Sequence, residues 1–146
     1  AYQTLVGAQE YPVTKIDIDK LVIPTPPLPV LPGIEALLSV QMLVEEGQLQ
    51  QNCIGSVSQI APAASGLVYY YRGIPPKCPE RCTIAVESHR REWMVSEIKG
   101  PCNKSVSRAT TAFVNDWLRA AQTPIPDWVE EMVDAEERRI ADEVPF

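Results

Sequence analysis

The segment Cys78–Cys102 constrains the fold most, because it has the pattern of a β-hairpin with cysteines at both of its roots. Apolar residues alternate with other residues over 82–87, and strand-forming residues return over 93–98. A polar interruption at 88–92 separates the two runs and contains no glycine that would select a turn type. The pattern therefore predicts two antiparallel strands but leaves their register open.

The two strands are expected to be amphipathic. We expect Met94 and Ile98 to lie on one apolar face with Val86, since side chains two residues apart share a face of a strand. Trp93 is then expected on the opposite, more polar face with Glu87.

The four cysteines predict disulfides. A hairpin returns Cys78 or Cys82 to the neighbourhood of Cys102, and Cys53 is then available to staple the preceding segment. Four cysteines allow three pairings, and sequence alone does not choose among them. Free buried thiols and a metal site are the alternatives, but the spacing lacks the compact cysteine pairs typical of zinc sites, so no metal is predicted.

Several features favour a secreted protein. Disulfides persist in oxidising compartments, and Asn103-Lys104-Ser105 is a sequon for N-glycosylation. A chain that opens Ala-Tyr-Gln fits a mature form after signal cleavage. We expect a secreted glycoprotein.

Length and charge limit the class of protein. At 146 residues, with 45% hydrophobic residues, the chain suits one ordered domain over 1–146. The formal net charge is -6, and the excess of acidic residues lies within 127–146. An acidic end repels phosphate backbones, which argues against nucleic acid as a partner.

The rest of the chain divides into segments of distinct pattern. The run 24–32 holds five prolines and predicts an extended connector that lays Leu28, Val30 and Leu31 along the surface; a ligand for a proline-reading module is the alternative. Together with the preceding apolar residues it is too broken by proline for a membrane span.

The other segments are expected to be strands at 15–23, 53–60 and 67–72, and helices at 33–51, 105–121 and 124–146, the last one acidic. The fold class predicted is α+β: a small antiparallel sheet packed on a buried central helix, with two C-terminal helices and disulfide staples.

Three surfaces are candidates for binding. Tyr69 and Tyr71 form an aromatic row beside Arg72, and this row could stack on a sugar or a base. His89, Arg90 and Arg91 form a basic knob at the expected hairpin tip. The acidic C-terminal helix could dock on a basic partner.

No catalytic or cofactor-binding motif is present in the sequence, so we predict no cofactor and no catalytic residue. The leading hypothesis is a secreted, non-enzymatic protein that binds another protein or a surface glycan. One alternative is a small secreted hydrolase with a site assembled from Glu87, His89 and Asp116. Another is a subunit of a larger assembly that lays the 24–32 arm on a neighbour. The composition resembles that of many secreted microbial effectors and toxins, a likeness of class that transfers no residues.

Overall fold

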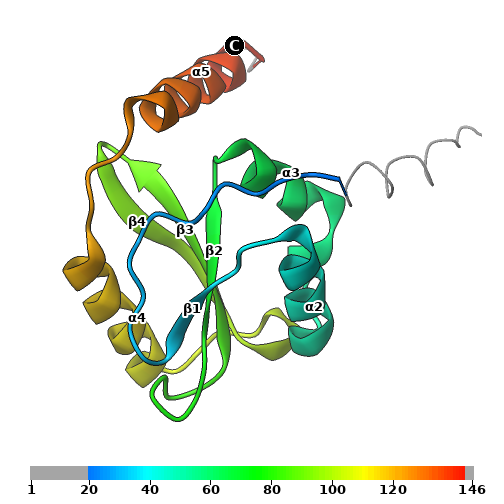
Figure 1. Cartoon of the computed structure of the whole chain (residues 1–146), viewed down its shortest axis with the longest axis vertical. Helices are drawn as coiled ribbons and strands as arrows, with labels where there is room; N and C mark the ends of the chain where they lie inside the picture. Colours follow the sequence, from blue (N-terminus) through cyan, green and yellow to red (C-terminus); the bar gives the residue numbers. More distant parts are fainter. Residues whose placement is uncertain (1–19, 144–146) are drawn as a thin grey trace, which may run out of the picture.

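The computed structural model describes residues 20–143, and within that range it contains a four-stranded antiparallel sheet with helices on both sides (Figure 1). The strands occur in the order β1-β2-β3-β4, so each is paired with its neighbour in sequence. They are β1 (Ile34–Ala36), β2 (Tyr69–Gly73), β3 (Cys82–His89) and β4 (Glu92–Lys99). The α-helices are α2 (Val40–Gln50), α3 (Val57–Ser65), α4 (Arg108–Ala121) and α5 (Asp127–Glu143), and short 3-10 turns lie at Cys53–Gly55 and Pro101–Asn103. The predicted α+β class is confirmed.

The predicted hairpin is present as β3 and β4, joined by a two-residue turn. Arg90 and Arg91 form the turn, with φ of 51° and 67°, and His89 pairs with Glu92 across it. Positive φ at both central residues is what a tight hairpin turn needs to match the twist of its strands. Two consecutive arginines in this conformation are uncommon, because glycine or asparagine normally occupies such positions.

A β-bulge in the hairpin overturns the predicted faces. Ala85 pairs with Glu97 but Val86 pairs with Val95, so Ser96 is an extra residue on β4. The extra residue reverses the alternation beyond it. Trp93 is therefore buried in the core and Met94 is 39% exposed, so the expectation for these two residues was wrong.

One face of the sheet packs against α4 and the proline-rich segment. Val114 and Trp117 of α4 join the sheet residues Tyr71 and Ile84 in one apolar cluster. Leu28 is buried in the same cluster, and its backbone N–H donates to the Tyr71 hydroxyl at 2.8 Å. The proline-rich segment thus packs against this chain's own sheet.

The outer residues of the proline-rich segment face away from the core. Val30 is 51% exposed and Leu31 is 37% exposed. The indole N–H of Trp117 donates to the Pro29 carbonyl at 2.9 Å, which fixes the segment over α4. The strand predicted at 15–23 lies largely outside the described residues, and residues 20–23 are irregular.

The opposite face of the sheet packs against α2 and α3. Leu43 of α2 and Ile60 of α3 join Tyr70 and Ala85 of the sheet in a second apolar cluster. The sheet is therefore sandwiched between two layers, and its central strands are buried on both faces.

The helix predicted at 33–51 is correct only in its second part. Ile34–Ala36 forms β1 and pairs with β2, while α2 begins at Val40. Ser39 is the cause of the boundary, since its hydroxyl accepts the backbone N–H of Met42 as an N-cap.

The strand predicted at 53–60 was wrong. The segment forms a 3-10 turn and then α3, and the Asn52 side chain caps the turn by accepting the N–H of Ile54. Ile60 and Ala63 lie three residues apart and are both buried, which is helical spacing.

The two C-terminal helices are present with shifted starts. Ser107, rather than Ser105, caps α4 by accepting the backbone N–H of Thr110 at 3.2 Å. Among residues 127–142 of α5, whose burial is described, only Val129 is fully buried, so most of this helix lies at the surface. No helix within residues 20–143 has the length and apolar character to cross a bilayer.

The predicted disulfide staples are not present in the structure. Cys78 and Cys82 are buried and Cys53 and Cys102 are exposed, and all four are free thiols. The hairpin does not bring Cys102 to either buried cysteine. The Cys102 thiol instead donates to Oε1 of Gln51 at 3.2 Å.

Candidate functional site

A groove of about 580 Å³ opens over the end of the sheet, between α3, the hairpin and α5. Four carboxylates line it, and we call it the acidic groove: they are Glu87 of β3, Glu97 of β4, and Glu136 and Glu137 of α5. Its lining contains no lysine or arginine. The groove is therefore a concave surface of one sign of charge.

Two periodicities place these side chains together. On β3, Ala85, Glu87 and His89 lie two residues apart and all line the groove. On α5, Val133 and Ile140 lie seven residues apart, two turns of helix, and line it from the other side. The acidic groove thus combines carboxylates with apolar side chains.

Tyr70 of β2 lies at the base of the acidic groove. Burial raises the pKa of its hydroxyl to about 12, and the negative charges of Glu97 and Glu87 add to the increase. The neutral hydroxyl donates to Oε1 of Gln59 at 2.7 Å. Tyr70 is therefore a neutral hydroxyl, bonded to Gln59, in the lining of the groove.

Two of the four carboxylates have basic neighbours outside the lining. The Arg139 guanidinium donates to Glu136, and these hydrogen bonds lower the pKa of that carboxyl. Lys99 Nζ lies 3.8 Å from a carboxylate oxygen of Glu97. Glu87 has no ion pair with another residue in the 20–143 range. The groove keeps a net negative charge after these pairs are counted.

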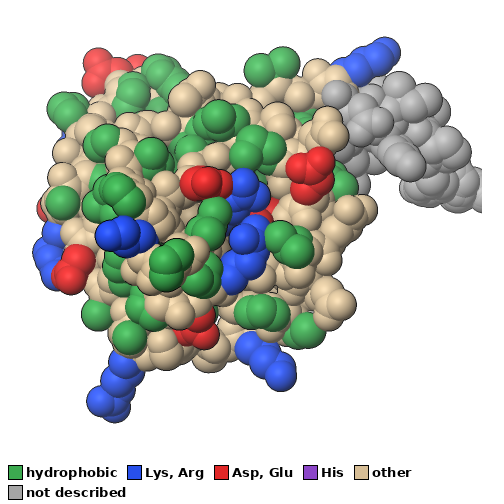
Figure 2. Space-filling view, turned by 60° about the horizontal axis from the view of Figure 1, so that its bottom comes forward, with side chains coloured by type: hydrophobic (Ala, Val, Ile, Leu, Met, Phe, Trp, Pro, Cys, Tyr) green, Lys and Arg blue, Asp and Glu red, His purple; other side chains and the backbone are tan. Residues whose placement is uncertain are grey.

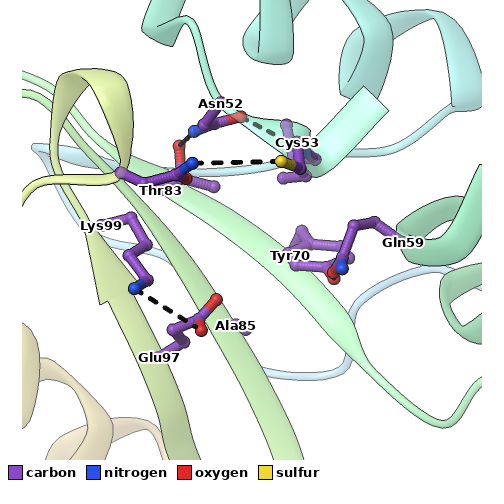
Figure 3. Close-up of a pocket in the computed structure, with 10 residues that line it drawn as sticks. Asn52, Cys53, Gln59, Tyr70, Thr83, Ala85, Glu97 and Lys99 are labelled. Carbon is purple, nitrogen blue, oxygen red and sulfur yellow. Dashed lines mark hydrogen bonds and ion pairs between the residues drawn. The ribbon is translucent and has the colours of Figure 1, made fainter. Parts of the chain in front are cut away.

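A second, smaller pocket of about 280 Å³ continues from the acidic groove (Figure 3). The two share lining residues, among them Gln59, Tyr70 and Glu97. Figure 3 shows the Lys99–Glu97 pair on one side of the pocket and Cys53 on another. The smaller pocket extends the site along the sheet beside α3.

The smaller pocket is lined mostly by hydrogen-bonding groups. Nδ2 of Asn52 donates to the Thr83 hydroxyl at 3.3 Å, and Nδ2 of Asn103 lies 3.9 Å from the Cys53 sulfur. The Cys53 thiol is the one strong nucleophile among them, and the lining holds no histidine that could act as its base. This arrangement suits polar recognition better than covalent chemistry.

No group of three or more histidine, cysteine, aspartate or glutamate side chains suited to a metal ion occurs in the described part of the chain.

The predicted aromatic row lies in the core. Tyr69 stacks edge-on against Trp93 with ring centroids 5.6 Å apart, and Tyr71 stacks against Trp117 at 4.9 Å. Both tyrosines are almost fully buried, so neither can stack on a ligand. The physical reason is that helices cover both faces of β2. Neither residue therefore forms a binding surface.

Arg72 forms part of an ion-pair network within the protein. Its guanidinium donates to the Glu35 carboxylate at 2.7 Å and lies 3.6 Å from the buried carboxylate of Glu46. Arg81 reaches the same Glu46 oxygen at 2.9 Å. Arg72 therefore has a structural role in this arrangement.

The hairpin tip is exposed, as the sequence indicates. His89, Arg90 and Arg91 are all exposed, but only His89 lines the acidic groove. Arg90 and Arg91 of the basic knob thus lie outside the groove lining, next to it in sequence.

The trio proposed for a hydrolase is not assembled. Glu87 and His89 both line the acidic groove. Asp116 lies on α4, which packs against the other face of the sheet, and its carboxylate pairs with Arg119.

The sequon residue Asn103 is exposed, and its glycosylation stays a prediction.

The acidic groove was not predicted as a site from the sequence. The acidic C-terminal helix was a candidate, but Glu87 was considered only on the polar face of the hairpin and in the hydrolase alternative, and Glu97 was not a candidate. One available signal was that Glu87 and His89 lie two residues apart and so share a face of the strand. Another was that the C-terminal helix carries the excess negative charge.

Another face of the molecule has a mixed charge pattern. On the face shown in Figure 2, basic, acidic and apolar side chains are interspersed, and several Lys or Arg side chains lie close together near the centre beside acidic ones. No protein-family model matches this chain, and neither the curated proteins nor the solved structures include a significant match to it.

Proposed function

We propose that this chain is a secreted, non-enzymatic binding protein whose acidic groove holds a basic segment of another protein. The observation that carries the proposal is a concave lining with four carboxylates and no lysine or arginine. Complementary charge steers a partner into such a surface and disfavours partners of the same sign.

Apolar side chains in the groove define the partner further. Met94 is 39% exposed and Ile140 is 48% exposed, and both line the groove together with the partly buried Val133. A ligand that alternates lysine or arginine with apolar residues would cover these side chains while it pairs with the carboxylates.

A protein partner fits better than a glycan. Sugars are usually bound by exposed aromatic rings, and the two tyrosines expected for that role are buried. The groove offers Tyr70, but its hydroxyl is already bonded to Gln59. The support for secretion is the Asn103 sequon, because the four cysteines are free thiols in the structure.

Selection from a random peptide library displayed on phage tests the proposal. We expect enriched sequences to combine lysine or arginine with apolar residues, and their binding to weaken as salt is raised. Enrichment of acidic or uncharged sequences would contradict the proposal.

Paired variants then locate the binding surface. Glu87→Gln combined with Glu137→Gln removes two groove charges, and exposed ion pairs contribute about 0.2–1 kcal/mol each, so binding should weaken about 2- to 30-fold. Glu45→Gln combined with Glu131→Gln removes two exposed charges outside the groove lining and should leave binding unchanged. Equal binding by both double variants would place the ligand elsewhere.

A further inference from the structure

The four cysteines form two spatial pairs, and neither is the pair expected at the hairpin roots. Cys82 lies opposite Gly73 in the sheet, and Cys78 lies in the loop between β2 and β3. A Cβ placed on Gly73 would lie 2.6 Å from the Cys78 sulfur and 2.8 Å from the Cys82 sulfur. Both sulfur atoms therefore converge on the space left by the missing side chain.

The two buried thiols interact directly. The Cys78 side chain lies close enough to Cys82 to affect the ionisation of its thiol, and both residues are fully buried. Burial, followed by the proximity of Cys78, raises the pKa of the Cys82 thiol to about 12. A thiol of this kind reacts slowly with external reagents, because the thiolate is the reactive form.

The two exposed cysteines lie where two chain segments touch. The Cys102 thiol donates to the Gln51 side chain at 3.2 Å, and the Asn103 amide lies 3.9 Å from the Cys53 sulfur. Each cysteine thus contacts a residue one or two positions from the other. The two thiols therefore lie in the same small region of the surface.

We propose that oxidation joins Cys78 to Cys82 and Cys53 to Cys102. The first bond closes a short loop in the core. The second links the end of α2 to the turn after β4, at the rim of the smaller pocket beside the acidic groove. This connectivity is independent of the binding role of the groove.

The chemistry is thiol–disulfide exchange with a low-molecular-weight disulfide such as oxidised glutathione. A cysteine thiolate attacks the glutathione disulfide, forms a mixed disulfide and releases one reduced glutathione. The second cysteine of the pair then displaces the other glutathione. Each pair gives up two electrons and two protons, and each glutathione disulfide becomes two thiols.

Trypsin can distinguish the three possible pairings, because a lysine or arginine lies between each cysteine and the next. The purified chain is reduced in denaturant and refolded with a mixture of reduced and oxidised glutathione, so that the buried thiols meet the reagent before they are enclosed. It is then alkylated, digested without reductant and analysed by mass spectrometry. We expect two linked products: peptide 78–81 bonded to 82–90, and peptide 21–72 bonded to 100–104. A link from 100–104 to either 78–81 or 82–90 overturns the assignment, as do four free thiols.

The difference in burial gives a second measurement. Under native conditions dithiothreitol should open the exposed Cys53–Cys102 bond, whereas the Cys78–Cys82 bond should open only after denaturation. Cys102→Ser is the matched variant, since an exposed serine keeps the fold, and it should retain the buried bond and leave Cys53 titratable. The proposal fails if Cys53 of this variant becomes bonded to Cys78 or Cys82, or if the buried bond is the first to open.

Discussion

The side-chain amide of Gln122 pairs with both backbone groups of Trp93. Its Oε1 accepts the Trp93 N–H at 3.2 Å, and its Nε2 donates to the Trp93 carbonyl at 2.8 Å. Because β4 is the edge strand of the sheet, these groups have no neighbouring strand. Gln122, directly after α4, supplies the bonds that a further strand would make and so protects one point of the edge.

Gln122→Ala should therefore destabilise the fold. Leaving a buried backbone donor or acceptor without a partner costs about 1–3 kcal/mol, and Trp93 is almost fully buried. Urea denaturation followed by tryptophan fluorescence measures the change. Gln48→Ala, at an exposed position of α2, is the control and should unfold at the wild-type midpoint. Equal midpoints for the two variants would mean that water replaces the amide at no cost.

The buried carboxylate of Glu46 should be the most sensitive charged group of the fold. It is fully buried in α2, accepts the Thr83 hydroxyl at 2.8 Å and pairs with Arg81 at 2.9 Å. Removing one member of a buried ion pair typically costs about 3–5 kcal/mol, so Glu46→Ala should unfold at much lower urea concentration.

Two comparisons isolate the charge of Glu46. Glu46→Gln keeps the shape and can still accept from Thr83, so it should lose less stability than the alanine variant. Glu45→Ala, at the adjacent exposed position, should have little effect. A Glu46→Ala protein as stable as wild type would show that the two arginines are satisfied by solvent alone.

Glu80 predicts a specific dependence of stability on pH. Its carboxylate accepts the Ser107 backbone N–H at 2.6 Å and the Thr110 hydroxyl at 2.7 Å, at the start of α4. These hydrogen bonds, the one from Ser107 first, lower the pKa of Glu80 from its ordinary value of 4.5. A depressed pKa in the folded state means that the carboxylate stabilises the fold above pH 4.5 and that this contribution is lost as the pH falls through the folded value.

The quantity to measure is the difference in the free energy of unfolding between wild type and Glu80→Gln. Urea unfolding over a series of pH values should show the variant less stable at neutral pH, with the gap closing as the solution becomes more acidic than pH 4.5. Glu131→Gln, an exposed position of α5, should show no such closing gap. A gap for Glu80→Gln that is constant with pH would assign its effect to shape rather than charge.

The hairpin could be predicted from the sequence because alternation over eight-residue strands is a strong signal. The bulge could not, since the extra Ser96 suits either face, and its presence reversed the expectation for Trp93 and Met94. Segment 53–60 was misread because a short apolar run is compatible with both strand and helix. The two candidate tyrosines, Tyr69 and Tyr71, are covered on the other face of the sheet by α4 and the proline-rich segment, and no local pattern in the sequence indicates that packing.

The acidic groove depends on tertiary packing that no local pattern encodes. The charge of α5 was evident, but its position over α3 is set by contacts such as those near Gly66, where an added Cβ would lie 3.1 Å from Trp128 and 3.2 Å from Met132. Without that position, Glu136 and Glu137 cannot be assigned to the same surface as Glu87.

Gly73→Ala tests the close packing of the two buried thiols in the reduced protein. The new methyl group would lie under 3.0 Å from both the Cys78 and Cys82 sulfurs, and adding a methyl group to a packed core costs about 1–3 kcal/mol. Gly100→Ala is the control, because its nearest contact would be an ordinary 3.4 Å. In the presence of reductant, Gly73→Ala should therefore unfold at a lower urea concentration than Gly100→Ala.

A double variant then identifies the sulfur as the cause. Cys78→Ala removes one of the two atoms that the alanine at position 73 would meet, so the combination should lose less stability than the two single changes added together. That non-additivity requires the contact, because a loss caused by backbone stiffening at Gly73 would be unaffected by the side chain at position 78. Strictly additive losses would place the Cys78 sulfur away from position 73, and would remove the convergence of the two sulfurs on which the Cys78–Cys82 bond is argued.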